Sequence, residues 1–345
     1  MMNISDASFF KTIRDFLTVY LPKQRRVSNN TVQSYRVSLN LYVDFLTEKL
    51  NLPLQRLSYD NVNRETVTAF LDWLQNERGC SAATRNQRLM AIRSFAKYSA
   101  MIDAANLYIQ SEVGKVPVQK SPSKIVEFLS DDSLKALLEQ PNRSKRNGLR
   151  DSFFMILMYD TAARCQEMLD LKLRDFVLDF ASPYVMLTGK GNKTRAVPLM
   201  DKTVQHLNHY LDKFHPAETR KNDDSLFYTI IHGRKNQMSP DTVAHFMKKY
   251  GKSAKPLCAD FPDNIHPHQL RHTRAIGWYR GGIPLVLVSE LLGHANVNTT
   301  QVYAYADTEM KRRAINKAMS QDESEQEAAV WQGDDDLIKK LYGLR

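Results

Sequence analysis

Apolar residues recur at helical spacing throughout the N-terminal part of the chain. The clearest segments are FFKTIRDFLTVYL, SNNTVQSYRVSLNLYVDFLTEKL, NRETVTAFLDWLQNERG and SAATRNQRLMAIRSFAKYSAM. Each has apolar positions three or four residues apart, and cap residues such as Ser81 or the stop signal Arg78-Gly79 mark their ends. The pattern predicts a small all-α domain over residues 1–112.

Residues 113–127, VGKVPVQKSPSKIVE, lack this periodicity. They contain two prolines and three lysines. Proline fixes φ and removes a backbone donor, so a helix is not expected in this segment. We interpret it as an extended, basic linker between two domains.

The helical pattern resumes at Ser130 and is interrupted by one strand-like segment. SDDSLKALLEQ and NGLRDSFFMILMYDTAARCQEMLDL predict helices, and SPYVMLTGKGNKTRAVPL has two short apolar runs around a glycine-containing turn. The second pattern is typical of a β-hairpin. Further helices are expected near 201–213 and 239–253, and a last cluster from His266 to about Lys317. Residues 128–310 therefore predict a mostly helical domain with a small antiparallel β-sheet, and the fold class is mainly α.

Residues 311–345 predict a C-terminal tail. Its stretch 321–336 holds seven acidic residues and no lysine or arginine. The final DDDLIKKLYGLR has the pattern of a short amphipathic segment. A frayed terminus is one interpretation of this tail, and docking into a neighbouring copy of the chain is the one that the family resemblance described below implies.

The composition points to a polyanionic partner. The chain of 345 residues carries a formal net charge of +10, and the acidic tail makes the rest more basic still. A basic protein of this size commonly binds nucleic acid. No apolar run is long enough for a membrane span, no secretory signal is visible, and three widely spaced cysteines form no disulfide framework. We expect a cytoplasmic protein without a membrane partner.

Basic and polar residues gather at Arg164, at Lys190, and in HPHQLRHTR followed by LLGH and a tyrosine. This combination suits phosphoryl transfer on a phosphodiester. A guanidinium group can donate two hydrogen bonds to a phosphate, and its charge stabilises the transition state. Histidine accepts or donates a proton near neutral pH. A tyrosine hydroxyl can form a covalent phosphate ester.

Each element alone has a simpler interpretation. Arg164 could pair with Glu167 on one helix, Lys190 could be a solvated turn residue, and Tyr303 could be a core aromatic. The histidines allow a metal site as a further alternative: His266, His268, His272 and His294. Two of them stand four residues apart, as zinc ligands on a helix do, but no carboxylate or cysteine lies close by in sequence. We expect no metal.

Order and spacing separate these alternatives. The blocks TAARCQEMLDL, GKGNKTRAVPL, HPHQLRHTRA and LLGHANVNTTQVYAYAD follow one another over residues 130–306. Together they resemble the tyrosine recombinase (phage integrase) family, especially its Xer-like and mobile-element members. The N-terminal helices resemble the core-binding, SAM-like DNA-binding domain of that family.

The resemblance implies a role for each matched residue. Arg164 and Arg271 would bind the scissile phosphate, and Glu167 would orient the helix of the first arginine. Lys190 would protonate the leaving 5′ oxygen, and His268 would assist proton transfer with the tyrosine. His294 would form a hydrogen bond with the phosphate. Tyr303 would attack the phosphorus and form a 3′-phosphotyrosine. Other basic residues are candidates for DNA contact: Arg85, Arg88, Arg93, Lys97 and Lys193.

The sequence departs from the family pattern at two places. TAAR stands where many relatives have a glycine just before the arginine, and AYA follows the expected nucleophile where relatives often have Thr-His. The second departure puts Tyr305 close to Tyr303. Helix positions two apart point about 200° from each other, so only one of the two can face the phosphate, and the family spacing selects Tyr303.

The resemblance also implies partners and cofactors. The expected partner is double-stranded DNA with specific recombination sites, bound by a tetramer whose protomers each clamp the duplex with two domains. No nucleotide cofactor and no metal are needed. Integration or excision of a mobile element, or Xer-type resolution, would be the function. The alternatives are a non-catalytic DNA-binding relative, a DNA-relaxing enzyme like a type IB topoisomerase, and a metalloenzyme using the histidines.

Overall fold

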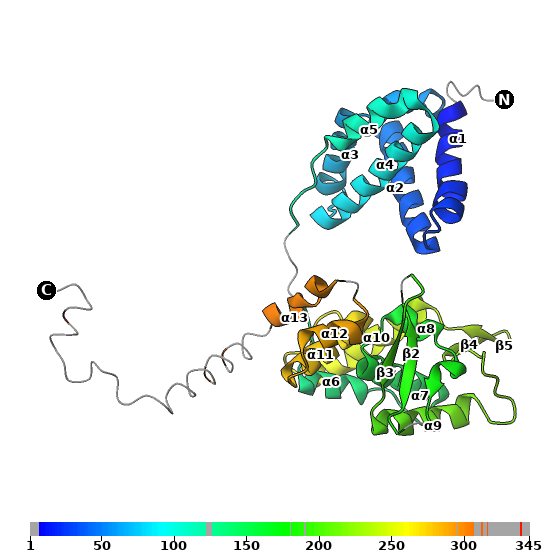
Figure 1. The fold of residues 1–345 in the computed structure, drawn as a ribbon, viewed down its shortest axis with the longest axis vertical. Helices are drawn as coiled ribbons and strands as arrows, with labels where there is room; N and C mark the ends of the chain where they lie inside the picture. Colours follow the sequence, from blue (N-terminus) through cyan, green and yellow to red (C-terminus); the bar gives the residue numbers. More distant parts are fainter. Residues whose placement is uncertain are drawn as a thin grey trace. The chain divides into compact units, whose positions relative to one another are not determined.

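The computed structural model describes residues 7–121, 126–179, 181–189, 191–294 and 296–306, together with Arg312, Asn316 and Lys339. The chain divides into two compact units, Met1–Lys124 and Ile125–Arg345 (Figure 1). The division falls inside the segment predicted as a linker. Most of the tail lies outside the described residues, so its docking stays a prediction.

The first unit is all-α in its described part, and polar side chains begin its helices. It contains α1 (Ala7–Asp15), the π-helix η1 (Phe16–Gln24), α2 (Asn29–Glu48), α3 (Arg64–Asn76), α4 (Ala82–Ile102) and α5 (Leu107–Gly114), with short 3-10 turns between them. Ser28, Asn63 and Ser81 each accept a hydrogen bond from the backbone three residues on, as N-caps do. The core is rich in aromatic rings, among them Phe9, Phe16 and Phe95.

The predicted linker starts too early in the sequence. Val113 belongs to α5, and Val116 is fully buried in the core of the first unit. Beyond them, the backbone oxygen of Gln119 accepts a hydrogen bond of 2.8 Å from the Asn86 side chain. The valines lie in a proline- and lysine-rich segment, and their burial overrides the local composition.

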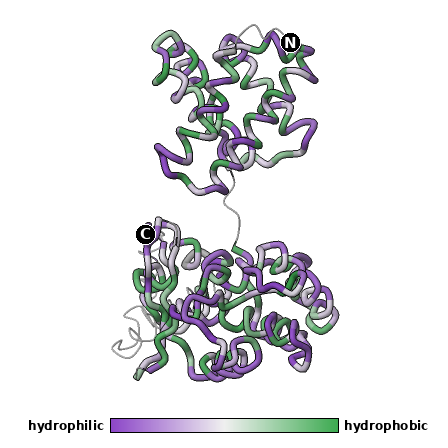
Figure 2. Tube along the Cα trace, turned by 90° about the vertical axis from the view of Figure 1, so that its right-hand side faces the viewer, coloured by the Kyte–Doolittle hydropathy of each residue, from purple (hydrophilic) through white to green (hydrophobic). Residues whose placement is uncertain are grey.

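The second unit packs its helices around α7. It contains α6 (Asp131–Leu138), α7 (Arg146–Thr161), α8 (Cys165–Asp170), α9 (Asp201–Phe214), α10 (Pro240–Ala254), α11 (Pro267–Arg280), α12 (Leu285–Leu292) and α13 (Gln301–Ala306). Helix α7 is buried nearly all round, as expected for a central helix: residues 153–158 are all apolar, and the buried charges of Arg150 and Asp151 form an ion pair. Figure 2 shows hydrophilic and hydrophobic positions alternating along the helices of both units.

The predicted hairpin is present and carries one more strand. Strands β2 (Tyr184–Thr188) and β3 (Thr194–Pro198) pair antiparallel, with Leu187 opposite Arg195. A short strand β1 (Phe176–Val177) adds to the free edge of β2. A second hairpin, β4 (Tyr228–Ile231) with β5 (Arg234–Gln237), was not predicted. The observed fold is mainly helical with small antiparallel sheets, which confirms the predicted fold class.

A helix needs about 20 apolar residues to cross a membrane. None of the helices of the described residues is both long enough and apolar enough to cross one.

Candidate active site

Arg164 lies where the chain turns sharply between α7 and α8. Ala162 ends α7 in the left-handed conformation, with φ at 48°, which costs a non-glycine residue about 1–2 kcal/mol. The turn puts Arg164 at the N-cap of α8. Its backbone N–H donates to Glu167 at 2.9 Å and its guanidinium donates to the same carboxylate at 2.7 Å. Glu167 thus holds both the backbone and the guanidinium of Arg164 at the start of α8, and its orienting role in catalysis stays a prediction.

Glu167 binds a second arginine that the sequence analysis did not select. Arg195, on β3, donates to both carboxylate oxygens of Glu167, at 3.1 and 2.7 Å. Glu167 is buried, and burial alone would raise its pKa, but the hydrogen bonds from Arg195 and Arg164 outweigh burial and lower the pKa below its ordinary value. The carboxylate is therefore ionised and shared by two guanidinium groups.

Arg271 lies on α11 and is 3 % exposed. Its guanidinium donates to the backbone oxygens of Ala162 and Leu292, both at 2.7 Å, and approaches His294 Nε2 at 3.1 Å. Burial lowers the pKa of Arg271 to about 10, so the group keeps its charge near neutral pH. Arg271 therefore ties the end of α7 to the end of α12.

His294 follows directly on the left-handed C-cap Gly293 of α12. Because Arg271 can only donate, the neutral ring accepts at Nε2. The other nitrogen, Nδ1, lies 2.8 Å from the hydroxyl of Thr300, just before α13. Burial and the neighbouring arginines Arg271 and Arg164 lower the pKa of His294 to about 4. The ring is thus neutral at physiological pH and links α12 to the segment that carries Tyr303.

Tyr303 is 1 % exposed, and its hydroxyl lies 2.9 Å from Nδ1 of His272. Burial raises its pKa, while Arg271 and Arg164 oppose the rise. The sequence analysis named His268 as the partner of this tyrosine and considered His272 only as a metal ligand. Both lie on one face of α11, and His268 is the exposed one, with its ring centroid 6.4 Å from that of His272. In this structure the hydrogen-bond partner of Tyr303 is His272, and the catalytic role of His268 stays a prediction.

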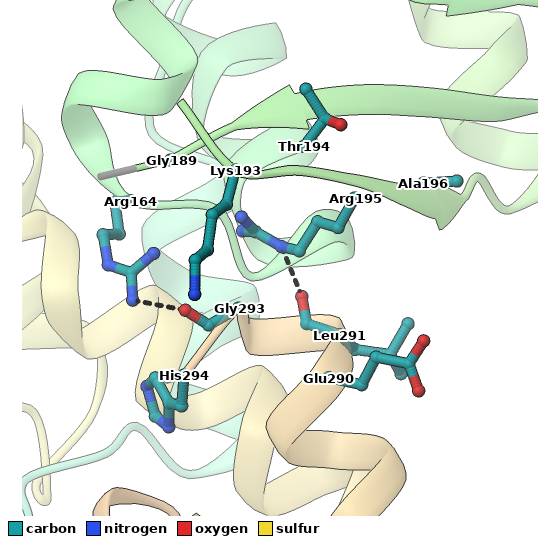
Figure 3. Close-up of a pocket in the computed structure, with 10 residues that line it drawn as sticks. All are labelled: Arg164, Gly189, Lys193, Thr194, Arg195, Ala196, Glu290, Leu291, Gly293 and His294. Carbon is teal, nitrogen blue, oxygen red and sulfur yellow. Dashed lines mark hydrogen bonds between the residues drawn. The ribbon is translucent and has the colours of Figure 1, made fainter. Parts of the chain in front are cut away.

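The two candidate lysines differ in what the structure describes. Lys190 lies outside the described residues. Lys193 lines a pocket of about 550 Å³ together with Arg164, Arg195 and His294, and Figure 3 shows its ammonium group beside Arg164. On a regular strand, Lys193 would point to the face opposite Lys190. Strand β3 begins only at Thr194, after the left-handed residue Asn192, so strand alternation does not apply to Lys193.

The histidines of the second unit belong to no cluster of metal-binding side chains in the described residues. Over the described ranges, no group of three or more histidine, cysteine or carboxylate side chains is placed to hold a metal ion. His272 and His294 instead bind Tyr303 and Thr300.

The arginines expected to contact DNA from the first unit have partners within that unit. Arg85 is 3 % exposed and donates to the backbone oxygen of Pro117, so its predicted DNA contact is corrected to a structural role. Arg93 donates to the end of α5, including Gly114, and Arg88 donates to Ser38. Lys97 is exposed. For Arg88, Arg93 and Lys97, contact with DNA stays a prediction.

Comparison with known proteins places the chain. A sequence model described as the phage integrase family matches residues 127–310, more than half of the chain, and a model of the phage integrase N-terminal SAM-like domain matches residues 13–101. The chain belongs to the phage integrase family. It is thus a tyrosine recombinase, an enzyme that catalyses DNA strand exchange, as the resemblance implied.

This integrase has relatives along most of its length. It is 30% identical over 313 residues to a putative integrase/recombinase, y4rC, of Sinorhizobium fredii, covering 90% of the chain and 92% of the relative. It is 28% identical to the tyrosine recombinase XerD of Staphylococcus saprophyticus, covering 89% and 98%.

Two solved structures of DNA complexes share the fold of the integrase. They are the XerH site-specific recombinase with difH substrate (TM-score 0.64, 21% identity, covering 89% of this chain and 87% of that one) and the Tn1549 transposon integrase with transposon end DNA (TM-score 0.66, 14% identity, covering 88% and 98%). At these identities the likeness concerns the fold alone.

Acid is expected to destabilise the integrase through two histidines. Burial lowers the pKa of His272 and of His294 to about 4, against an ordinary value of 6.5. Between about pH 6.5 and pH 4 the unfolded chain therefore binds protons that the folded chain excludes. Their contribution is constant above pH 6.5, and the free energy of unfolding should fall as the pH falls through this window.

Urea unfolding at several pH values measures this effect. The double variant His272→Asn, His294→Asn should show a shallower fall between pH 6.5 and pH 4 than the wild type. An unchanged slope would mean that other groups cause the acid sensitivity.

Proposed function

We propose that this integrase is a site-specific recombinase that cuts and rejoins duplex DNA with Tyr303 as its nucleophile. The observation that carries the proposal is the contact of the Tyr303 hydroxyl with His272, in the domain where Arg164 and Arg271 both reach the end of α12. Phosphodiester transesterification needs cationic groups, a proton acceptor and a nucleophile. This domain supplies two guanidinium groups, the neutral imidazoles of His272 and His294, and a tyrosine hydroxyl.

The two arginines would bind the non-bridging oxygens of the scissile phosphate. Their charges offset the negative charge that develops on those oxygens as the phosphorus becomes five-coordinate. In the free protein both guanidinium groups hold backbone oxygens, Arg164 that of Gly293 at 3.1 Å and Arg271 that of Leu292. These bonds fix their positions before DNA arrives, so less ordering is needed on binding.

Strand cleavage would be a transesterification at the scissile phosphorus. The Tyr303 oxygen forms a bond to phosphorus while the bond from phosphorus to the 5′ oxygen breaks. The phenolic proton leaves to a neutral imidazole, with His272 at hydrogen-bond distance and His268 next to it. Lys190 supplies a proton to the leaving 5′ oxygen. In the second step a different 5′ hydroxyl gives its proton to the neutral Lys190 amine and attacks phosphorus. The bond from phosphorus to the tyrosine oxygen breaks, the protonated imidazole returns its proton to that oxygen, and a rejoined strand results.

The general acid is expected to be Lys190, and its role can be separated from that of Lys193. Lys190→Ala should slow cleavage of ordinary DNA but leave cleavage of DNA with a 5′-bridging sulfur near the wild-type rate, because a thiolate leaves without protonation. Single-turnover cleavage of both substrates measures this. Lys193→Ala should be impaired equally on the two substrates. Rescue of Lys193→Ala by sulfur, with none for Lys190→Ala, would transfer the role to Lys193.

We further propose a partner and an assembly. The substrate is double-stranded DNA carrying specific recombination sites, and the active unit is a tetramer on that DNA in the cytoplasm, acting in mobile-element integration or excision or in Xer-type resolution. The similarity to XerD and the shared fold of recombinase–DNA complexes support this proposal. Exchange of strands between two duplexes requires a nucleophile for each cut strand, which four protomers supply.

Covalent trapping tests the proposed function. The full chain would be incubated with DNA of its host, denatured, and the protein-linked fragments sequenced. Enrichment of one pair of short sites, with exchanged flanks in the products, is the expected result. Binding without any covalent link would indicate a non-catalytic relative. Relaxed circles without exchanged segments would indicate a topoisomerase-like enzyme.

A further inference from the structure

The end of α12 is held by three arginines from three separate segments. Arg195 of β3 donates to the backbone oxygen of Leu291 at 2.7 Å, Arg271 to that of Leu292, and Arg164 to that of Gly293. These are three consecutive carbonyls at a helix C-terminus, where backbone oxygens lack partners within the helix and the helix dipole favours cations.

Arg164 and Arg271 belong to the proposed phosphate site. The third arginine, Arg195, instead contacts Glu167 and the backbone oxygen of Leu291. We propose that Arg195 is a positioning residue for strand cleavage, which fixes Arg164 through Glu167 and His294 through α12. This inference rests on the proposed function and adds to it a residue that contacts neither the phosphate nor the nucleophile in the steps described above.

The contacts of Arg195 use both edges of its guanidinium group. Two parallel N–H groups donate to the two oxygens of Glu167, and Nε donates to Leu291. The side chain is only 10 % exposed and Glu167 is 4 % exposed, so water competes little for these bonds. The planar fork of arginine can make all three bonds at once, whereas the single ammonium of lysine cannot span both partners.

Two glycines leave room for this ion pair. A Cβ atom on Gly293 would lie 2.9 Å from the Arg195 guanidinium, and one on Gly189 would lie 2.9 Å from Glu167. Gly293 also has a left-handed φ of 63°, which residues other than glycine rarely adopt. At both positions the backbone therefore lies so close to the ion pair that a side chain would crowd it.

Loss of Arg195 would act on the phosphate site at two points. Glu167 would keep Arg164 as its only described ion-pair partner, so Arg164 would be drawn toward the carboxylate and away from a phosphate. The end of α12 would lose one of its three anchors, and His294 follows that end directly. Displacements of about 1 Å at such groups reduce rates by roughly a hundredfold.

The test compares Arg195→Lys and Arg195→Ala with the wild type in the full chain. Three quantities would be measured: the Kd for a DNA site, the single-turnover cleavage rate and the thermal unfolding midpoint. We expect cleavage to fall by about ten- to a hundredfold in Arg195→Lys while DNA affinity changes little. The lysine keeps one charge on Glu167, so this variant should fold even where Arg195→Ala does not.

A matched control is available on the surface. Arg174 also pairs with a carboxylate, Asp223, but both side chains are more than half exposed. Arg174→Ala should cleave at the wild-type rate. A second measurement is the double variant Glu167→Gln, Arg195→Lys: because the two residues act as one unit, its loss of rate should be smaller than the product of the two single losses.

The outcomes separate the two proposals. If the wild type forms no covalent link to DNA, the proposed function fails. If the wild type cleaves DNA and Arg195→Lys cleaves equally fast, the positioning role is wrong while the function stands. A loss of rate that multiplies independently with that of Glu167→Gln would also overturn the role, because Arg195 would then not act through Glu167.

Discussion

Tyr303→Phe is expected to abolish covalent attachment of the integrase to DNA while leaving DNA binding close to the wild type. The substitution removes one hydroxyl, and with it the atom that would bond to phosphorus. The ring is fully buried in a cluster with Ala162, Ile276 and Leu292, which phenylalanine fills equally well. The lost bond to His272 should cost about 1 kcal/mol of stability, too little to prevent folding.

Tyr305→Phe is the matched control for this variant. Tyr305 lies two residues further along α13, and it is expected to keep the adduct because positions two apart on a helix face opposite sides. Protein trapped on a nicked substrate would be digested and the DNA-linked peptide identified by mass spectrometry. An adduct on Tyr305, or one that persists in Tyr303→Phe, would overturn the choice of nucleophile.

The second large effect is expected at the phosphate-binding arginines. Arg164→Ala and Arg271→Ala should each reduce the cleavage rate by roughly a hundredfold or more, because each removes positive charge where transition-state charge develops. DNA affinity should change far less, since each arginine makes few of the many phosphate contacts expected of a DNA-binding protein. Single-turnover cleavage and equilibrium binding on one substrate measure the two quantities separately.

The two arginine variants differ in what else they disturb. Arg271 is buried and holds the oxygens of Ala162 and Leu292, so Arg271→Ala leaves buried acceptors unpaired at a cost of about 1–3 kcal/mol each. Arg164 is a third exposed, and Arg195 still neutralises Glu167 in its absence. Arg164→Ala is therefore the cleaner probe of catalysis. Cleavage at the wild-type rate in a folded Arg164→Ala protein would refute its assignment.

The sequence was informative wherever a local signal coincided with the fold. Cap residues such as Ser81, the apolar run of α7 and the glycine turn before β3 depend on neighbours in the chain, and all three predictions are confirmed. The order of the four blocks also identified the family correctly. Local periodicity is the most dependable secondary-structure signal, and these elements are long or strongly marked.

Predictions failed where distant residues decide the outcome. Arg195 pairs with Glu167 and with Leu291, far away in sequence on either side, and a hairpin arginine gives no local sign of such contacts. Arg85 was a candidate for DNA contact because it is basic, but it is buried and donates to the backbone oxygen of Pro117. Only the tertiary fold decides whether an arginine side chain donates to a backbone oxygen or is free to contact a ligand.

His272 is a contact residue of the tyrosine that the sequence pattern did not single out. His268 and His272 are four residues apart on α11, so both lie on one helix face and the sequence cannot tell which one reaches the tyrosine. The choice depends on where α13 packs, and in the structure α13 places Tyr303 against His272. Both histidines therefore stay candidates for proton transfer with the tyrosine.

The three anchored carbonyls at the end of α12 also restrict how this chain can change in length. Each residue added to a helix turns the following carbonyls by about 100°, so one insertion or deletion within α12 would misalign its end with Arg164, Arg195 and Arg271 together. The β4–β5 hairpin, exposed along β5 and turning at Gly233, carries no such constraint. Insertions and deletions among relatives should therefore gather in loops of that kind, while α12 keeps one length from Leu285 to Leu292.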